Sequence, residues 1–276
     1  MDKSGNLCYY YRELLCGEQD GTSHVLPGKV CLTLRIDVMG VGFDNLTKSE
    51  FTAKAEDMLE KKERGYVVTP NAEIVYESIQ DDGFRALLNG ASMVLPDGAG
   101  VVLGAKILGT PIKEKVAGIE FGEEVCKLLA RNNGRLYLLG SKPGIAKAAG
   151  DKLMEKYPGL VICGTADGYF KDEKAVIEKI NEAKPDVLFV CLGAPKQEKF
   201  IKEHFEELDV TLMLGLGGSL DGYAGVAQRA PKWMIDLSLE WLYRLLKEPK
   251  RIGRMMRLPK FVVACGSEKL RRKKNG

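Results

Sequence analysis

Short apolar runs and longer amphipathic segments alternate along the chain from residue 31 onward. The apolar runs predict strands at residues 31–38, 65–69, 91–95, 135–139, 160–163, 186–192 and 210–216. The segments between them predict helices at residues 45–62, 71–89, up to about 108, 119–131, 143–157, 172–183 and 196–205. Strands that alternate with helices of this length are typical of βαβ units. The pattern therefore predicts an α/β fold with a Rossmann-like, mostly parallel sheet and helices on both faces.

The same pattern divides the chain into three parts. Residues 1–30 look like loop and are predicted to be a variable N-terminal extension. Residues 31–230 carry the alternating pattern and form the predicted α/β domain. Residues 231–276 are predicted to be a basic C-terminal helical appendage, since residues 232–247 repeat apolar side chains at helical spacing. The run 269–274 at its end is predicted to be a disordered tail attracted to membranes.

The net charge of +3 is unevenly distributed. Residues 247–276 contain eleven Lys and Arg against two Glu, a net charge of +9, so the remainder carries −6. A basic end suggests an anionic partner: a membrane surface, a nucleic acid or a phosphorylated ligand. Arg244, Arg251 and Arg254 stand at helical steps beside apolar residues, which favours a segment on anionic lipid. We expect no nucleic-acid partner, because aromatic-rich strands that would stack bases are missing.

Cysteine usage and hydropathy indicate the compartment. The chain has seven cysteines and no CxxC pair. Cys126, Cys163 and Cys191 lie in apolar segments, where reduced core thiols are expected. The sequence shows no signal peptide, and no apolar stretch reaches the roughly eighteen residues of a membrane-spanning helix. These features predict a cytoplasmic protein.

Glycines and small polar residues follow nearly every predicted strand. In parallel sheets, ligands bind outside the carboxyl ends of the strands. Any one glycine could simply close a turn, but six such loops together favour a ligand with phosphate groups bound to backbone N–H groups. The loops begin at Thr69, Pro96, Gly140, Gly164, Gly193 and Gly215.

Several classes of nucleotide and metal site do not fit the sequence. Gly215-Leu216-Gly217 begins a dinucleotide fingerprint, but Leu220 occupies its last glycine position, which disfavours a nucleotide-dependent oxidoreductase. No GxxxxGK[ST] loop and no Asp-x-Asp pair occurs. His24 and His204 have no partner at metal-ligand spacing, and His204 is predicted to face solvent. We therefore expect no metal and no cofactor, and a carboxylate as any catalytic base.

Asp97 stands directly after an apolar run, in Leu95-Pro96-Asp97-Gly98. A carboxylate at this point suits the N-cap of a following helix. It also suits a catalytic base at the mouth of a parallel sheet, and the local sequence leaves both interpretations open.

A series of short motifs, in order along the chain, resembles the WecG/TagA/CpsF family of bacterial glycosyltransferases. The resemblance covers about residues 34–258. Its motifs are Thr69-Pro70-Asn71-Ala72-Glu73, Leu95-Pro96-Asp97-Gly98, Val116-Ala117-Gly118, Leu138-Leu139-Gly140, Gly168-Tyr169-Phe170, Gly193-Ala194-Pro195-Lys196-Gln197-Glu198-Lys199, Gly217-Gly218-Ser219, Arg229-Ala230-Pro231 and Glu240-Trp241-Leu242-Tyr243-Arg244-Leu245.

The resemblance implies an inverting, metal-independent transfer of a sugar from a UDP-sugar donor to a polyprenyl-diphosphate-linked sugar acceptor. It favours N-acetylmannosamine moved onto undecaprenyl-diphosphate-linked N-acetylglucosamine, for a wall teichoic acid linkage unit or a related surface polysaccharide. Glucose or a mannosaminuronic acid remains an alternative donor sugar. The expected location is the inner face of the cell membrane, with peripheral attachment. In solution, the apolar appendage could instead be buried in a homo-oligomer.

The resemblance also implies roles for individual residues. Asp97 matches the catalytic base, and Thr69, Asn71 and Gln197 match the donor-sugar pocket, with Thr69 and Gln197 taking part in catalysis. The remaining matches on the substrate-binding edge are Gly140, Ser141, Gly168, Tyr169, Ala194, Pro195, Gly217, Gly218 and Asp221. Arginines of the appendage that close over the site match Arg244, Arg251 and Arg254. Lys115 stands where the family commonly has an arginine, which keeps the charge but loses the bidentate geometry.

Overall fold

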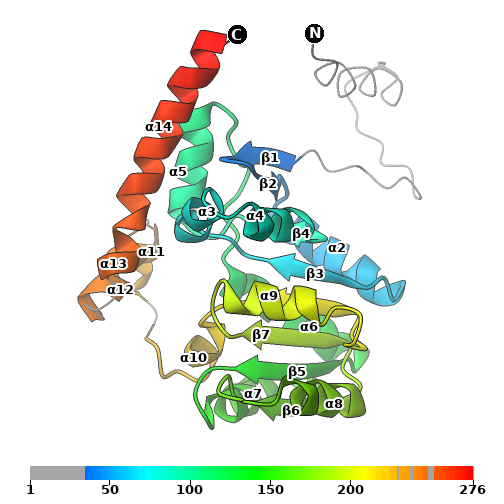
Figure 1. Cartoon of the computed structure of the whole chain (residues 1–276). Coiled ribbons are helices and arrows are strands. Elements are labelled where there is room, and N and C mark those ends of the chain that lie inside the picture. The colour runs from blue at the N-terminus through cyan, green and yellow to red at the C-terminus, as the bar shows by residue number, and fades with distance from the viewer. Residues whose placement is uncertain (1–34, 229, 237–238, 248–251, 276) are drawn as a thin grey trace, which may run out of the picture. The chain divides into compact units, whose positions relative to one another are not determined.

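The structure is a computed structural model that describes residues 35–228, 230–236, 239–247 and 252–275 (Figure 1). These residues belong to one compact unit, residues 33–276. Six parallel strands form its central sheet in the order β4-β3-β8-β7-β5-β6. The strands are β3 (Gly65–Val68), β4 (Met93–Val94), β5 (Arg135–Gly140), β6 (Val161–Ala166), β7 (Val187–Cys191) and β8 (Leu212–Gly215). The predicted parallel α/β fold is confirmed.

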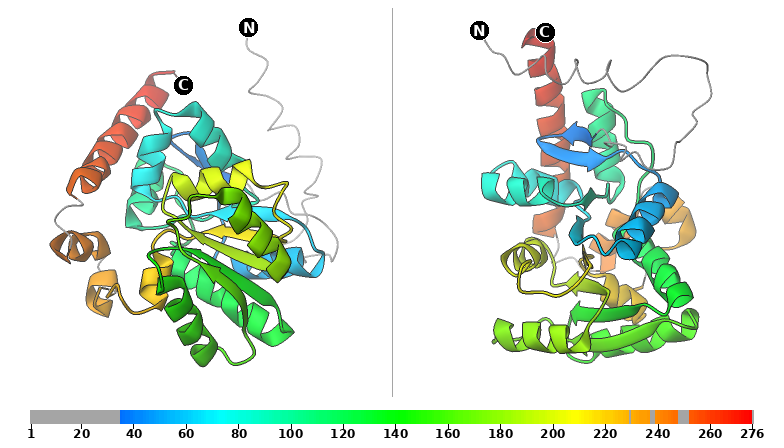
Figure 2. Two further views of the ribbon diagram at one scale, coloured as in Figure 1. Left: turned by 60° about the horizontal axis from the view of Figure 1, so that its bottom comes forward. Right: turned by 90° about the vertical axis from the view of Figure 1, so that its right-hand side faces the viewer.

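Helices cover both faces of this sheet (Figure 2). One face is covered by α3 (Ala72–Ser78), α4 (Asp82–Asn89), α5 (Ala99–Leu108), α8 (Glu173–Ala183) and α9 (Lys196–Glu203), and α14 (Arg257–Asn275) adds Phe261 and Cys265 to the same core through its contacts with α5 and α3. The other packs against α2 (Lys48–Glu60), α6 (Gly118–Asn132), α7 (Ile145–Lys156) and α10 (Ser219–Tyr223). Strand β7 shows the division: Leu188 and Val190 join the first core, and Val187 and Phe189 join the second. Successive side chains of a strand point to opposite faces, so a buried parallel strand is apolar throughout.

An antiparallel hairpin precedes the sheet and was not predicted. Strands β1 (Arg35–Val38) and β2 (Val41–Asp44) pair across a two-residue turn at Met39 and Gly40, both with positive φ. Such turns match the twist of paired strands. Of the predicted strand 31–38, residues 31–34 lie outside the described residues.

The predicted helix 71–89 is in fact two helices. α3 ends at Ser78, and α4 begins after Asp81, whose Oδ1 accepts a hydrogen bond from the Phe84 N–H at 2.8 Å. A capping aspartate inside a helical pattern starts a new helix, because its side chain competes for backbone N–H groups. The prediction of one continuous helix is therefore wrong.

The C-terminal segment is also helical where a disordered tail was predicted. α14 includes residues 269–274 and packs beside α5 and α3, and both views of Figure 2 show it next to α5. Phe261 and Cys265 are buried, and a Cβ on Gly104 would lie 2.6 Å from the Phe261 ring. The glycine is thus what permits close contact between the two helices.

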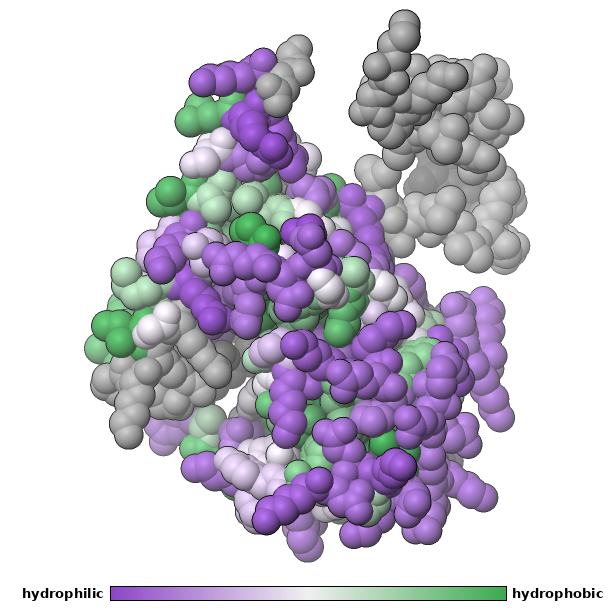
Figure 3. Space-filling view, in the orientation of Figure 1, coloured by the Kyte–Doolittle hydropathy of each residue, from purple (hydrophilic) through white to green (hydrophobic). Residues whose placement is uncertain are grey.

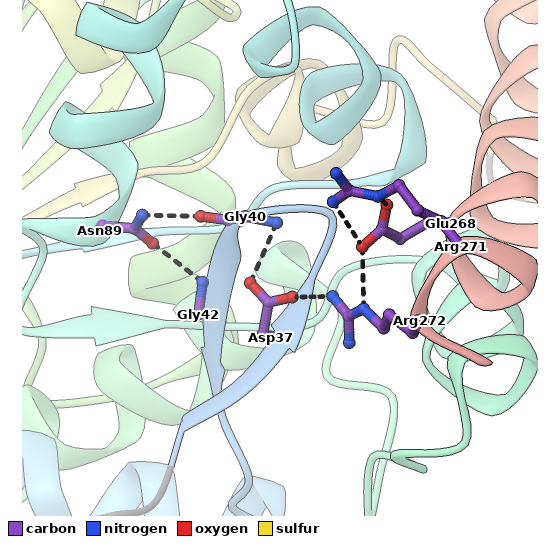
Figure 4. Close-up of polar contacts among 7 residues, drawn as sticks. All are labelled: Asp37, Gly40, Gly42, Asn89, Glu268, Arg271 and Arg272. Atoms are coloured by element: carbon purple, nitrogen blue, oxygen red, sulfur yellow. Dashed lines mark hydrogen bonds and ion pairs between the residues drawn. The ribbon is translucent and has the colours of Figure 1, made fainter. Parts of the chain in front are cut away.

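Ion pairs hold both ends of α14 to the domain, and Figure 4 shows the pair near its C-terminal end. Arg257 Nη1 lies 2.6 Å from Glu77 Oε2 in α3, and Arg272 Nη2 lies 2.7 Å from Asp37 Oδ1 in β1. Glu268 accepts hydrogen bonds from Arg271 and Arg272 and aligns the second of these for Asp37. Part of the basic end therefore faces acidic partners within the chain.

Three short helices connect the α/β domain to α14. They are α11 (Lys232–Asp236), α12 (Glu240–Lys247) and α13 (Ile252–Met255). The amphipathic pattern over 232–247 thus forms two helices. Four large apolar side chains of these helices are exposed, Trp233, Trp241, Leu246 and Ile252, and so is Met256, which follows α13. Figure 3 shows hydrophobic surface where Figure 1 places α12 and α13.

Candidate functional site

The predicted site residues gather at the carboxyl ends of the parallel strands. Thr69 follows β3, Asp97 follows β4, Gln197 follows β7 at the start of α9, and Gly217 follows β8. These four strands are consecutive in the sheet, so their ends form one continuous edge. The edge is the candidate site.

Thr69 joins two central strands at this edge. Its Oγ1 donates a hydrogen bond to the carbonyl oxygen of Gly215 at 2.9 Å, and its side chain is buried. A Cβ on Gly118 would lie 3.1 Å from the Thr69 side chain, so the start of α6 comes close behind it. The geometry gives Thr69 a clear part in fixing the end of β8.

Gln197 is the most constrained polar side chain of the edge. It is 2 % exposed, its Oε1 accepts a hydrogen bond from the Gly217 N–H at 2.9 Å, and its Nε2 donates one to Glu198 Oε1 at 2.8 Å. Both ends of the amide are therefore held. Gln197 links α9 directly to the glycine loop after β8.

Asn71 and Asp97 come from neighbouring loops. Asn71 is the N-cap of α3, and its Oδ1 accepts hydrogen bonds from the backbone N–H groups of Glu73 and Ile74 at 2.9 and 3.1 Å. A Cβ on Gly98, the residue after Asp97, would lie 3.9 Å from the Asn71 Cβ. The loops that carry the two residues thus meet at one corner of the edge.

Asp97 is half-buried, and the N-cap of α5 is Gly98, with φ +85°. The sequence hypothesis that Asp97 is itself the N-cap residue is therefore wrong by one position. The Val116 N–H donates to the carbonyl oxygen of Pro96 at 3.0 Å. This bond holds the loop that carries the half-buried Lys115 next to Asp97.

A second cluster lies at the ends of β5 and β6. Ser141, with φ +58°, donates from Oγ to Asp221 Oδ1 at 2.9 Å, and its carbonyl oxygen accepts from the Gly168 N–H at 2.8 Å. Position 140 requires glycine for two reasons. Its φ is +133°, and a Cβ there would lie 2.3 Å from the Cys191 carbonyl oxygen. Tyr169 is 67 % exposed beside this cluster. An exposed aromatic ring over tightly bonded loops suits a nucleoside.

The two clusters are connected along the chain and across it. Gly217 and Gly218 lead directly into α10, which carries Asp221. On the other side, Ala194 and Pro195 are joined by a cis peptide bond just before Gln197. The structure thus brings the predicted residues of the α/β domain to one edge, in two adjoining groups.

The predicted arginines of the appendage cannot be placed in this way. Arg251 lies outside the described residues, and the side chains of Arg244 and Arg254 are not described either. Their assigned roles stay predictions.

Glu198 is a residue of the edge to which the sequence argument gave no role. It is 1 % exposed, and burial raises the pKa of its carboxyl group above the ordinary 4.5. Helical spacing was the available signal, because Glu198 lies three residues before the buried Ile201. His204 also differs from prediction: its side chain is 14 % exposed and lies between Glu173 and Glu207, at 3.1 and 3.3 Å.

Two further searches concern only the part of the chain that the structure describes. Within it, His, Cys, Asp and Glu side chains form no group of three or more that could hold a metal ion. None of its helices has both the length and the apolar character needed to cross a membrane.

Known proteins identify the family. A model of the "Glycosyl transferase WecG/TagA/CpsF family" matches residues 36–275. A Bacillus spizizenii protein is 36 % identical over 206 residues, 75 % of this chain and 80 % of its own length, and a Bacillus subtilis protein is 35 % identical over 215 residues, 78 % and 84 %. A Staphylococcus aureus (strain MW2) protein is 33 % identical over 244 residues, 88 % and 96 %.

Each of these relatives is named N-acetylglucosaminyldiphosphoundecaprenol N-acetyl-beta-D-mannosaminyltransferase. The family match reaches residue 275, so the prediction that the resemblance stops near residue 258 is wrong, and the sequence of α14 lies within the match. The chain belongs to the WecG/TagA/CpsF family of glycosyltransferases.

Proposed function

We propose that this protein transfers N-acetylmannosamine from UDP-N-acetylmannosamine to undecaprenyl-diphosphate-linked N-acetylglucosamine, with inversion and without a metal ion. The product would be a wall teichoic acid linkage unit or a related surface polysaccharide precursor. The observation that carries the proposal is the edge where Thr69, Asn71, Asp97 and Gln197 meet. The names of the relatives support the choice of donor and acceptor.

Asp97 acts as the general base in this proposal. Its carboxylate accepts the proton of the acceptor hydroxyl while that oxygen attacks the anomeric carbon of the donor. The bond from the anomeric carbon to the UDP oxygen breaks, and its electron pair leaves with UDP. Attack from the face opposite UDP inverts the anomeric configuration. The half-buried position of Asp97 leaves it accessible to a sugar hydroxyl.

The departing diphosphate gains negative charge, which must be stabilised. The loops at the ends of β5 and β7 lead into the N-termini of α7 and α9, and the preorganised N–H dipoles of helix N-termini stabilise developing anions. Lys115, beside Pro96, supplies positive charge near the same corner. Arg244, Arg251 and Arg254 are proposed to complete this environment when acceptor is bound.

The nucleoside is proposed to bind at the second cluster. Ser141 and Asp221 are fixed by their mutual hydrogen bond, and Asp221 keeps a further carboxylate oxygen as an acceptor for ribose or base donors. Gly168 and the exposed Tyr169 form the adjoining wall.

The appendage is proposed to place the enzyme on the inner face of an anionic membrane. Its exposed Trp233, Leu246, Ile252 and Met256 are apolar, and lysines at 232, 247 and 260 accompany them. Apolar side chains that enter the interface, with basic residues around them, bind peripheral proteins to anionic lipid. A lipid-linked acceptor then reaches the site without leaving the bilayer.

The test is product formation with a panel of donors. Purified protein, EDTA, a polyprenyl-diphosphate N-acetylglucosamine analogue and UDP-N-acetylmannosamine should yield one added N-acetylhexosamine by mass spectrometry, with a changed anomeric configuration by NMR. Product from UDP-glucose or a UDP-mannosaminuronic acid alone would replace the donor in the proposal. Absence of product with every donor, in a protein that still binds UDP, would contradict transfer to this acceptor.

A further inference from the structure

Glu198 occupies an unusual position for an acidic side chain. It is the third residue of α9 and lies on the buried face of that helix with Gln197, Phe200 and Ile201. Acidic residues are seldom fully buried unless they are paired. Glu198 therefore needs an explanation that general packing does not provide.

The hydrogen bonding of Glu198 is half complete. Its Oε1 accepts from Gln197 Nε2 at 2.8 Å, whereas its Oε2 is buried without a hydrogen-bond partner among the described residues. Among them, only Thr110 Oγ1 shares that condition. A buried polar atom without a partner costs stability, and such atoms in native proteins often mark a functional constraint.

The surroundings of Glu198 raise the pKa of its carboxyl group. Burial raises the pKa of its carboxyl group, and the carboxylate of Glu77 in α3 raises it further, while the hydrogen bond from Gln197 lowers it. Glu77 is itself bound to Arg257 of α14. Whatever the charge of the group, its Oε1 is the acceptor of the hydrogen bond from Gln197 Nε2 at 2.8 Å.

That acceptor decides how the Gln197 amide is oriented. An acceptor at Glu198 requires the NH₂ group of Gln197 on that side, which leaves the carbonyl oxygen facing the Gly217 N–H. The reversed amide would place its carbonyl oxygen against Glu198 Oε1 and its NH₂ group against the Gly217 N–H. Both contacts would then be lost, because each would join two acceptors or two donors.

We propose that Glu198 is a positioning residue of the transferase site, which fixes the orientation of the Gln197 amide and thereby the glycine loop at Gly217. The effect on turnover rests on the proposed function, because the family resemblance assigns Gln197 to the donor-sugar pocket. The effect on the loop does not, and it is measured separately.

The test compares Glu198→Leu with Glu198→Gln in the full-length protein. Leucine fills a similar volume but accepts no hydrogen bond, whereas the glutamine carbonyl still accepts from Gln197. In E198L, we expect the Gly217 amide proton to exchange with solvent about tenfold faster than in wild type, and its NMR resonance to move. We also expect turnover to fall about tenfold, while the KM for the donor changes by a smaller factor. In E198Q, both readouts should stay within about twofold of wild type.

Thr110→Val is the matched control, because it removes the other buried oxygen without a partner and should change neither readout. The proposal would be overturned if the Gly217 amide proton of E198L exchanged at the wild-type rate. It would also be overturned if E198Q lost as much turnover as E198L while the Gly217 amide of E198Q exchanged as in wild type. Absence of transfer in wild type would contradict the proposed function, while Gly217 exchange in the three proteins would still decide the positioning role. If E198L does not fold, Glu198→Met takes its place under the same criteria.

Discussion

The sheet edge and the C-terminal helices solve different problems with different side chains. At the edge, polar groups are buried and bonded to one another: Thr69 to Gly215, Gln197 to Gly217, and Ser141 to Asp221. In α11 to α13, large apolar side chains are exposed instead, and Leu246 is 70 % exposed. These hydrogen bonds at the edge are made within the protein, whereas the exposed apolar side chains of α11 to α13 are suited to contact with a surface outside it.

This difference separates two tasks that a lipid-dependent transferase must combine. A rigid edge holds catalytic and binding groups in fixed geometry, which lowers the entropic cost of reaching the transition state. In the proposed function, the exposed apolar segment next to α14, which is anchored through Phe261, is the part that brings that edge to the lipid. The following predictions test whether the two tasks can be separated experimentally.

Asp97→Asn should have the largest effect. Asparagine keeps the shape but cannot accept the acceptor proton, so we expect transfer to fall by about 10²–10⁴-fold. UDP affinity should stay within about threefold of wild type, because uncharged asparagine removes no donor contact proposed here. Product formation followed by mass spectrometry, with calorimetric UDP titration as its control, measures both. Wild-type turnover would show that Asp97 is not the base.

Phe261→Ala should have the next largest effect, on stability rather than chemistry. Removing this fully buried ring from the contact with α5 should lower the free energy of unfolding by about 3–5 kcal/mol. Val263→Ala, on the exposed face of the same helix at 68 % exposure, should change it by less than about 0.5 kcal/mol. Urea unfolding compares the two, and equal effects would mean that α14 is not anchored through Phe261.

The triple variant Trp233→Ser, Leu246→Ser, Ile252→Ser should weaken liposome binding. Burial of each side chain in lipid contributes up to about 1.5–3 kcal/mol, so we expect at least about a tenfold weaker affinity for anionic vesicles. Point variants are preferable to truncation, because loss of α14 would uncover α5.

A second triple variant, at apolar exposed residues outside the appendage, is the control for the appendage variant. Leu103→Ser, Met154→Ser and Val161→Ser together should leave vesicle binding unchanged. Sedimentation equilibrium in detergent-free buffer shows whether the appendage variant also alters self-association. Unchanged vesicle binding in the appendage variant would refute its membrane role.

Glu198→Gln should have the smallest effect, seen as a pH dependence of stability. The raised pKa means that the folded protein keeps this proton above pH 4.5 while the unfolded chain releases it. The contribution of the Glu198 carboxyl group to the free energy of unfolding is therefore fully present below pH 4.5, and it is lost as the pH rises through the pKa of the folded protein. The stability of E198Q relative to wild type in urea unfolding should therefore increase as the pH rises above 4.5, and a difference that does not change with pH would contradict a raised pKa at Glu198.

The sequence predicts the sheet well because each strand is a continuous apolar run between helical segments. It predicts the location of Thr69, Asp97 and Gln197 for the same reason, since residues that follow parallel strands share an edge. It predicts a helical appendage over residues 231–276, but it does not predict that α14 continues through residues 269–274, because the charge of that run is typical of a disordered tail. That helix is stabilised by tertiary contacts, which local composition does not show.

Glu198 illustrates the same limit within the site. Its place in the motif was visible, but its role depends on Gln197 and Gly217, twenty residues apart in sequence and joined only by the fold. Asp221 and Ser141 are eighty residues apart and meet for the same reason.

The central claim is that the carboxyl edge of the sheet binds the nucleotide of the donor. Backbone amide NMR of the labelled protein during UDP titration in EDTA tests it most directly. We expect the largest changes in amide chemical shift at Ser141, Gly168, Tyr169 and Gly217. We expect none at Gly134, which precedes β5 at the opposite edge of the sheet. Shifts centred on Gly134, or confined to α11 to α13, would contradict it.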